Sequence, residues 1–379
     1  MKVLIVGAGP AGSATAETIL TLQPKHEVTI VEQRASLEEN PRCAGGVHAT
    51  AFDDLGIQVP ESVFAAKISR LRIYSPNDEY WEIDSKSVGM KSMGYVFHRG
   101  LLDKCLCERA QKLGAQLMLN TKARQIDEKK NILITDMGPI PFDVLVYAKG
   151  PVFNKDKSAE FRIGIQEIVH SDHPQDLISM YFGQELAPHG YAWIVPDGEG
   201  KTKIGVGIDC SLKSSPKAYL RLFEHKLGVT STDGALASKL VPTGKPPKTG
   251  VKKGPLGTTI LSVGDSLPAC DPLHGGGIIN AIVSGRAAGR AIAGGFPQMY
   301  DKFWRSELYK ENMQRYHMKT MLSKFRDENF NTAISVLKDF QPESASVGHE
   351  LGRVFMFLAR KAPHLVGKKL LGRILFRQL

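Results

Sequence analysis

The chain has 379 residues, of which 42% are hydrophobic and 23% charged, proportions typical of a globular protein with two or three domains. They exclude a disordered, collagen-like or disulfide-stapled chain. Lysine and arginine number 49 against 39 aspartate and glutamate, so the net charge of +10 favours anionic partners. Five cysteines without a framework spacing suit a reducing compartment. No apolar run reaches the ~18–20 residues of a membrane span, so we expect a cytoplasmic protein.

The first segment with a clear pattern is the apolar run 2–6, which predicts a buried parallel strand. A turn of small residues follows it, with Gly7, Gly9, Ala11 and Gly12, and a helix-compatible stretch runs from residue 13 to 22. In such a turn the glycines allow a tight bend, the close approach of a pyrophosphate and close packing of helix on strand. The N–H groups at the start of the helix would bind the phosphates.

A second strand is predicted at 27–31, and it ends at Glu32, twenty residues after Gly12. An acid at this position accepts hydrogen bonds from an adenosine ribose and repels the 2′-phosphate of NADP. Strand, glycine turn, helix, strand and acid at this spacing together predict a Rossmann-type dinucleotide-binding unit. This pattern alone does not separate NAD from FAD.

A second glycine-rich segment lies far along the chain. Residues 258–263 form an apolar run that leads into Gly264 and Asp265, and a helix is predicted to begin at Ile278, directly after Gly275, Gly276 and Gly277. This arrangement resembles the second FAD signature of the para-hydroxybenzoate hydroxylase-type flavoproteins. The resemblance implies FAD as cofactor, with Asp265 on the ribityl chain and the helix N-terminus at the flavin edge that becomes negative on reduction. Between the signatures, Arg99 begins a helix that resembles the group's Arg-x-x-Leu-Asp element, whose arginine approaches the cofactor.

Two further motifs narrow the resemblance. Cys43, Ala44 and Gly45 stand in an Arg-Cys-Ala-Gly-Gly stretch, and Tyr191 and Trp193 stand in a Tyr-x-Trp-x-x-Pro stretch. Together they resemble the geranylgeranyl reductase family, and the first of them is most similar to its archaeal members. The resemblance implies that Cys43, Ala44 and Gly45 lie by the flavin, that Cys43 is catalytic, and that Tyr191 and Trp193 line the isoprenoid cavity.

The implied activity is reduction of isolated C=C bonds in geranylgeranyl chains, most closely those of a digeranylgeranylglycerol phospholipid. The same fold leaves alternatives open: a monooxygenase, a halogenase, a reductase for chlorophyll, tocopherol or quinone precursors, or a non-enzymatic FAD-containing lipid-binding protein. The hydroxylases' Ala-Asp-Gly element is replaced around Lys149, which weakens the monooxygenase alternative.

Three partner predictions follow from charge and motifs. No second glycine fingerprint for a nicotinamide nucleotide is found, so we expect a ferredoxin-like electron donor, with NAD(P)H as the alternative. Residues 351–379 hold seven lysines and arginines and no acid, with apolar residues at helical spacing. This basic tail predicts peripheral contact with the inner face of the membrane. No nucleic-acid recognition motif is present, no metal site is expected, and the oligomeric state stays open.

The predicted fold class is α/β, with a Rossmann-type FAD-binding domain of the para-hydroxybenzoate hydroxylase kind, an inserted β-rich substrate domain and a C-terminal helical segment. We assign 1–60, 92–165 and 245–300 to the FAD domain, 61–91 and 166–244 to the substrate domain, and 301–379 to the helical segment. Residues 242–255, rich in glycine, proline and lysine, are predicted to form a linker.

Overall fold

The computed structural model describes residues 1–39, 43–152, 160–229, 236–343 and 347–366, with backbone alone for 347–351. The chain forms two compact units. The first unit contains residues 1–41, 99–154 and 242–313, and the second contains 42–98, 155–241 and 314–379. None of the described helices is long and apolar enough to cross a bilayer.

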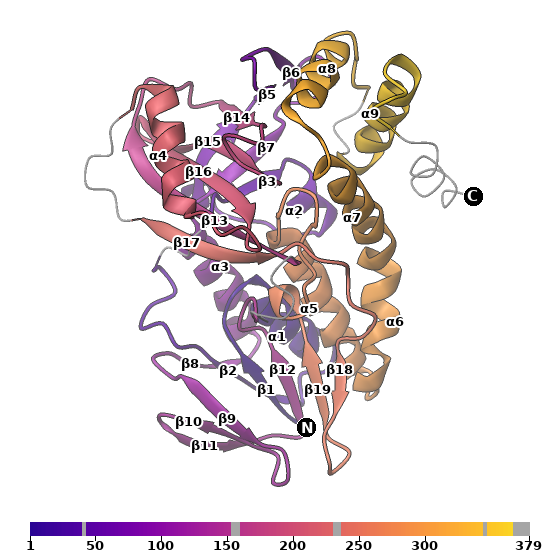
Figure 1. The fold of residues 1–379 in the computed structure, drawn as a ribbon. Helices are drawn as coiled ribbons and strands as arrows, with labels where there is room; N and C mark the ends of the chain where they lie inside the picture. The colour runs from indigo at the N-terminus through magenta and orange to yellow at the C-terminus, as the bar shows by residue number, and fades with distance from the viewer. Residues whose placement is uncertain (40–42, 153–159, 230–235, 344–346, 367–379) are drawn as a thin grey trace. The chain divides into compact units, whose positions relative to one another are not determined.

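A six-stranded sheet, called here the parallel sheet, is the centre of the first unit (Figure 1). Its neighbouring strands run parallel except for the antiparallel edge strand β18. In spatial order the strands are β18 (Val251–Lys253), β19 (Thr259–Ser262), β12 (Val144–Tyr147), β1 (Lys2–Val6), β2 (Glu27–Val31) and β8 (Gln116–Met118). The predicted strands 2–6 and 27–31 therefore have the expected bounds. The predicted loop-like linker at 242–255 is confirmed for residues 243–250, which form no helix or strand. It was wrong for residues 251–253, which form β18 because they pair with β19.

Strand β1 is apolar and buried from Val3 to Val6 because both faces of the parallel sheet are covered there. Val3 and Ile5 belong to a core with residues of α1 and α5, while Leu4 and Val6 pack with residues near a small three-stranded sheet. That sheet is β11 (Gly138–Pro141), β10 (Ile132–Thr135) and β9 (Ala123–Asp127). The helices of the unit are α1 (Pro10–Leu22), α3 (Arg99–Lys112), α5 (Ile278–Ala293) and α6 (Tyr300–Trp304).

The second unit is built on a seven-stranded sheet, called here the large sheet. The described pairings are antiparallel except for the parallel pair β14–β5. Its order is β17 (Ala237–Pro242), β13 (Phe161–His170), β16 (Lys201–Asp209), β15 (Tyr191–Gly198), β14 (Leu177–Tyr181), β5 (Arg70–Tyr74) and β6 (Tyr80–Asp84). A three-stranded sheet joins β3 (Gly46–His48), β7 (Gly94–Phe97) and β4 (Phe64–Ile68).

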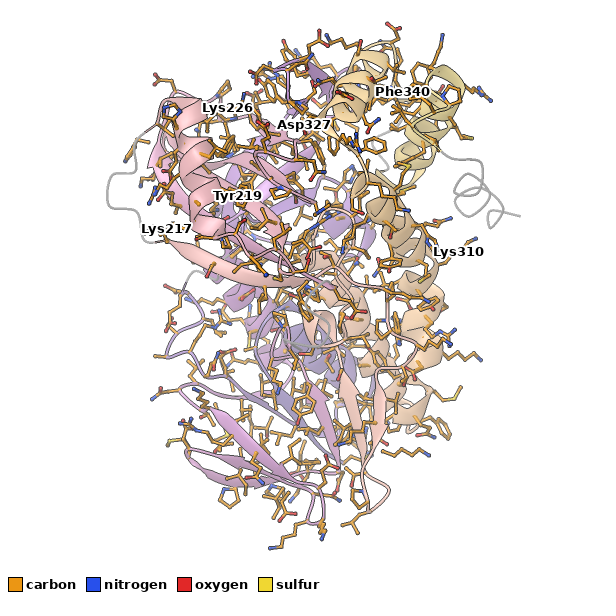
Figure 2. All side chains as sticks on the ribbon, viewed as in Figure 1. Lys217, Tyr219, Lys226, Lys310, Asp327 and Phe340 are labelled. Atoms are coloured by element: carbon orange, nitrogen blue, oxygen red, sulfur yellow. The ribbon has the colours of Figure 1, made fainter. Side chains whose placement is uncertain are left out.

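The large sheet presents two different faces. One is covered by α4 (Pro216–Leu227), whose Leu220 and Phe223 are buried with Ile194 and Val206 of the sheet. Lys217 and Lys226 of α4 are exposed, and Lys226 pairs with Asp78 (Figure 2). The opposite face carries Trp193 and Val195, which pack with residues of the three-stranded sheet and with Ala44. This opposite face therefore brings together the two motifs that the sequence separates by about 150 positions.

The remaining helices of the second unit are α2 (Ala51–Asp54), α8 (Asp327–Leu337) and α9 (Val347–Lys361), and α7 (Lys310–Leu322) runs from the first unit's residues into the second's. Residues 42–60, which we assigned to the FAD domain, cluster with the second unit. Two contacts account for this: β3 pairs with β7, and the Phe52 ring lies 5.0 Å from that of Phe97, centroid to centroid.

Candidate functional site

The turn after β1 in the first unit depends on glycine at two positions. Gly7 has φ +109°, a conformation that side chains rarely adopt, and a Cβ there would lie 2.4 Å from the Ala148 carbonyl oxygen. A Cβ on Gly12 would lie 1.9 Å from the Gly7 carbonyl oxygen. Gly9 differs, because a Cβ built there meets nothing within 4 Å. The space beside Gly9, at the start of the 13-residue helix α1, fits a phosphate group.

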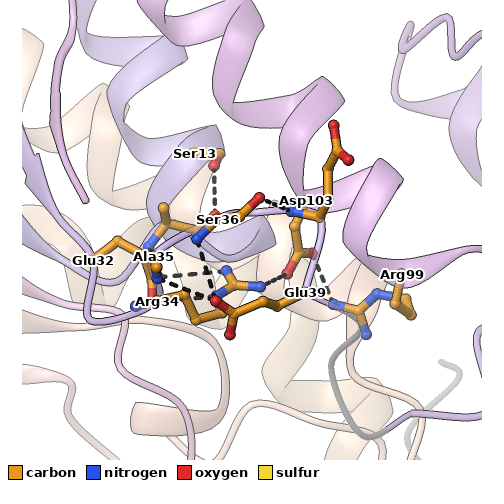
Figure 3. Close-up of polar contacts among 10 residues, drawn as sticks. Ser13, Glu32, Arg34, Ala35, Ser36, Glu39, Arg99 and Asp103 are labelled. Carbon is orange, nitrogen blue, oxygen red and sulfur yellow. Dashed lines mark hydrogen bonds and ion pairs between the residues drawn. The ribbon is translucent and has the colours of Figure 1, made fainter. Parts of the chain in front are cut away.

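Glu32, at the end of β2, is a buried carboxylate held by three donors (Figure 3). Its Oε2 accepts the Ala8 N–H at 2.9 Å, and its Oε1 accepts the Arg34 N–H at 3.0 Å and pairs with the Arg34 side chain. Burial by itself raises the pKa of Glu32, but the hydrogen bonds from Arg34 and Ala8 outweigh it and leave the pKa below its ordinary value. Glu32 is therefore ionised at neutral pH, as an acceptor for ribose hydroxyls must be.

Arg34 extends this contact into a row of alternating charges (Figure 3). Its guanidinium lies 3.3 Å from one carboxylate oxygen of Asp103, whose other oxygen accepts a 2.9 Å hydrogen bond from Arg99. Arg99 and Asp103 are buried and stand one turn apart on α3. The structure thus connects Arg99 to Glu32 through Arg34 and Asp103. Sequence reasoning missed these two bridging residues because Arg34 precedes Asp103 by 69 positions and only the fold pairs them.

The second glycine-rich segment is also organised by buried polar contacts. Gly264 has φ +57° and donates its N–H to the Ser284 hydroxyl at 2.9 Å, which holds the segment against α5. A Cβ on Gly277 would lie 3.0 Å from the Asp265 carboxylate, so Asp265 stands at the N-terminus of α5. Ile278 is the first residue of that helix.

Asp271, which sequence reasoning passed over, shapes the loop before α5. Its carboxylate accepts the N–H groups of Leu273 and His274, its own N–H donates to Gly276, and its carbonyl accepts the N–H of Gly275. Gly275 has φ +77°. These hydrogen bonds fix the conformation of the loop that leads into α5. An aspartate before proline and three glycines was the signal that could have found it.

These features of the first unit fit FAD. The space at Gly9 accommodates phosphate, Glu32 is an ionised acceptor, and Asp265 stands beside a helix N-terminus of the kind that stabilises negative charge. Among the described residues, no group of three or more histidine, cysteine, aspartate and glutamate side chains is arranged to hold a metal ion.

Substitution by alanine should show that Gly12 is needed for folding and Gly9 for binding of FAD. Gly12→Ala forces a Cβ into the Gly7 carbonyl and should lower the free energy of unfolding by about 3 kcal/mol or more. Gly9→Ala should leave the stability of the FAD-free protein unchanged, because the added methyl meets no protein atom, yet it should weaken FAD retention by at least tenfold. Thermal denaturation and flavin absorbance of the purified variants measure both quantities. Normal FAD retention in Gly9→Ala would show that no FAD phosphate binds beside Gly9.

In the second unit, the segment after Cys43 turns sharply into β3. Gly45 has φ +86°, and a Cβ there would lie 2.6 Å from the carbonyl oxygen of Phe97. The Gly45 carbonyl in turn accepts the Phe97 N–H at 3.0 Å. Cys43 is partly exposed, and Ala44 packs beside Trp193 and Val195. The structure therefore brings Cys43, Ala44 and Gly45 to the same face of the large sheet as Trp193.

The indole of Trp193 lies over a row of glycines from neighbouring strands. A Cβ on Gly205 would lie 2.4 Å from Cζ2 of Trp193, whereas Cβ atoms on Gly207 and Gly164 would lie at ordinary contact distances of 3.5 and 3.6 Å from the ring. The indole Nε1 is buried and has no hydrogen-bond partner among the described residues. Glycines at 205 and 207 in a strand are the sequence signal that could have revealed this close packing.

Tyr191 continues an aromatic row away from Trp193. Its ring centroid lies 5.8 Å from that of Trp193 and 5.9 Å from that of Phe182. Phe182 stacks with Phe330 of α8 at 5.3 Å. The row is secured by the Gln184 N–H, which donates to the Asp327 carboxylate at 2.6 Å. Tyr191 and Trp193 therefore lie together in one row with two phenylalanines that the motif does not include.

Gly205→Ala should displace the Trp193 ring, because a methyl group 2.4 Å from Cζ2 cannot be accommodated without movement. We expect a loss of about 1–3 kcal/mol in the free energy of unfolding and a shift in tryptophan fluorescence. The matched control is Gly207→Ala in the same strand, where the added methyl makes an ordinary contact. Equal effects of the two substitutions would contradict the packing described here.

The comparisons with known proteins agree on one family. Residues 160–236 match the model described as the geranylgeranyl reductase catalytic domain, a segment that includes Tyr191, Trp193 and Gly205. A digeranylgeranylglycerophospholipid reductase of Methanosarcina acetivorans is 29% identical over 90% of this chain and 89% of its own length. A second such reductase, from Methanopyrus kandleri, is 27% identical over 96% of this chain and 97% of its own.

Among solved structures, a geranylgeranyl bacteriochlorophyll reductase-like protein of Thermoplasma acidophilum is 25% identical, with a TM-score of 0.85 over 98% of this chain and 99% of its own. A flavin-dependent halogenase at 17% identity has a TM-score of 0.62 over 94% and 70%, and shows the fold alone. The predicted resemblance and fold class are confirmed.

Proposed function

We propose that this chain, a relative of the geranylgeranyl reductases, is an FAD-dependent reductase that saturates isolated C=C bonds of geranylgeranyl chains in lipid biosynthesis. The observation that carries the proposal is the match of residues 160–236 to the reductase catalytic domain, because this segment supplies the Trp193 face of the large sheet. Similarity over 90% or more of the chain to reductases of a digeranylgeranylglycerol phospholipid makes that lipid the proposed substrate.

FAD is the cofactor of the proposed reaction, and it would supply the hydride. The turn at Gly9 and the N-terminus of α1 would hold the phosphates, and Glu32 would accept hydrogen bonds from the adenosine ribose. Arg99, fixed by Asp103, would contact the cofactor, and Asp265 would bind the ribityl chain. The N-terminus of α5, with Gly275–Gly277, would stabilise the negative charge that reduction creates. The geometry that supports these roles lies entirely in the first unit.

The chain's own residues would contribute to alkene reduction in two ways: they would position the alkene, and they would exclude water from it. An isolated trisubstituted alkene has no conjugated group to accept a hydride, so proton delivery must accompany hydride transfer. The resulting cation-like transition state has to be shielded from water. Tyr191 and Trp193 provide aromatic walls for the isoprenoid, and Cys43 positions the alkene or assists its protonation. Support comes from the shared face of Ala44, Trp193 and Val195.

An anaerobic single-turnover experiment tests the proposal. The bound flavin is reduced with dithionite, and a geranylgeranyl-chain phospholipid is then added without oxygen. We expect reoxidation of the flavin and a gain of two hydrogens per reduced bond in the lipid, measured by absorbance and mass spectrometry. Cys43→Ser should retain its FAD and lose at least about tenfold in this rate, since general acid–base groups contribute ~10²–10⁴-fold.

A monooxygenase, a halogenase or a structural flavoprotein would leave the flavin reduced until oxygen is admitted, and that result would overturn the proposal. Unchanged turnover in Cys43→Ser would instead remove only Cys43 from the reaction. Phospholipids with saturated chains serve as the substrate control.

We also propose that the electron donor is a small acidic carrier of the ferredoxin type. The net charge of +10 supports it, because a basic surface accelerates association with an acidic carrier. Lys149, which replaces the hydroxylases' acidic element, is exposed and lies over the Tyr147 ring, with Nζ 4.7 Å from the centroid.

Stopped-flow reduction of the flavin tests the donor. Reduction by ferredoxin should be fast at low salt and should slow by at least tenfold between low and high ionic strength, because screening removes electrostatic steering. Dithionite is the control, since a small reductant needs no docking surface. Fast, salt-insensitive reduction by NADPH would contradict the prediction.

The basic C-terminal segment is proposed to contact an anionic membrane surface. Arg360 and Lys361 are exposed at the end of α9, while Arg353 is engaged with Glu343 at 2.6 Å. The other basic residues of the predicted tail lie outside the described residues: Lys368, Lys369, Arg373 and Arg377. Salt-sensitive sedimentation with anionic vesicles is the corresponding measurement.

A further inference from the structure

The segment Cys43–Gly45 in the second unit has all three of its carbonyl groups engaged. The Cys43 carbonyl accepts a hydrogen bond from Nε2 of Gln166 at 3.3 Å, and the Ala44 carbonyl accepts one from Nζ of Lys203 at 3.3 Å. The third, on Gly45, accepts the Phe97 N–H. Two of the three donors are therefore side chains of the large sheet.

Lys203 is a buried charge that the proposed function does not yet use. It is 1% exposed, although a lysine is almost never fully buried unless its ammonium is paired. The pairing partner is Asp197, whose Oδ1 lies 2.5 Å from the ammonium. An ion pair in the interior contributes little net stability compared with apolar residues of the same size. The buried ion pair is better explained by a second contact of the Lys203 ammonium, its hydrogen bond to the Ala44 carbonyl.

The strand register explains why these side chains reach the segment. Gln166 pairs with Gly205, Gly205 pairs with Trp193, and residues directly opposite one another share a face of the sheet. Lys203 stands two positions from Gly205 in β16 and so lies on that face as well. Gln166 and Lys203 thus come from the face that also carries the Trp193 indole.

Asp197 is placed by an irregularity of the hairpin between β15 and β16. Pro196 pairs with Thr202 and Gly198 pairs with Lys201, so Asp197 is an additional residue without a counterpart. Such a bulge redirects a side chain, and bulges are frequent beside active sites. Here Asp197 is brought to the ammonium of Lys203.

We propose that Gln166 and Lys203, the latter held by Asp197, are positioning residues that fix the backbone of Cys43 and Ala44 and thereby set the location of the Cys43 thiol. The inference rests on the proposed function, which gives the Cys43 thiol its role in alkene reduction. Its physical basis is that the Cys43 segment is not part of a helix or strand, so side-chain donors replace the backbone pairing that would otherwise hold it.

The test uses the full-length, FAD-loaded protein and two routes to remove the donors. Gln166→Met removes one donor and leaves no charge behind. Lys203→Met is combined with Asp197→Asn, because the single change would leave a buried carboxylate without its cation and could prevent folding. The matched control is Glu167→Gln. Glu167 neighbours Gln166 in β13 and is also buried, but it pairs with Arg221 of α4, on the other side of the large sheet.

The first readout is the rate at which iodoacetamide alkylates Cys43, followed by peptide mass spectrometry so that the other four cysteines do not interfere. Release of the segment should raise this rate by about fivefold in Gln166→Met, the factor that corresponds to one ordinary hydrogen bond. The second readout is alkene reduction, where kcat should fall by about tenfold or more while KM and FAD content stay near wild type, because misplacement of a reacting group affects the chemical step.

Wild-type alkylation rates in both Gln166→Met and the double variant would overturn the inference, as would an equal change in Glu167→Gln. Failure of the wild-type protein to reduce any alkene would overturn the proposed function instead. The alkylation result does not depend on that activity, so the two failures are distinguishable.

Discussion

In each unit, one glycine permits an approach to the backbone that a Cβ atom would block. In the first unit, Gly12 stands over the carbonyl of Gly7, so that α1 can begin directly at the end of β1. In the second unit, Gly205 allows the Trp193 indole to lie on the sheet itself. Where a side chain is absent for this reason, the space is taken by the backbone or by a neighbouring ring. The conformation of the turn after β1 and the position of the Trp193 ring follow from that constraint.

Buried charge is arranged differently in the two units. In the first unit, Glu32, Arg34, Asp103 and Arg99 alternate in sign, so the two carboxylates and two guanidinium groups compensate one another at little exposure. This row keeps Glu32 ionised and fixes the conformation of Arg99. In the second unit, a single ion pair is buried next to an irregular segment of backbone. In both cases buried charge is used to define a geometry, which apolar packing alone specifies less sharply.

The two faces of the large sheet pack against different parts of the second unit. Residues such as Ile194 and Val206 point to α4 and form an apolar core, which any sheet of this size needs. Their neighbours in the same strands, Trp193 and Lys203, lie on the other face with Ala44. Alternation along β15 and β16 therefore lets adjacent residues serve the core and the site in turn.

The sequence by itself determined the local features. Strands β1 and β2 and helix α5 have the predicted bounds, because each is an apolar segment with a clear boundary: a glycine follows β1, charged residues stand at both ends of β2, and glycines flank α5. Glu32 directly follows β2, and Asp265 stands three residues after the end of β19, as the spacing in the sequence indicated. These are short-range properties, and propensity and turn chemistry decide them.

Only the tertiary structure decided which distant residues meet. Nothing in the sequence around Arg34 indicates Asp103, and nothing around Cys43 indicates Gln166 or Lys203, which follow by 123 residues or more. The ion pair of Asp197 with Lys203 depends on a bulge in β15 that the sequence does not reveal. Strand β18 forms because it pairs with β19. Hydrogen bonds and ion pairs between strands depend on register, and register is set by the packing of the whole sheet, so local patterns cannot specify it.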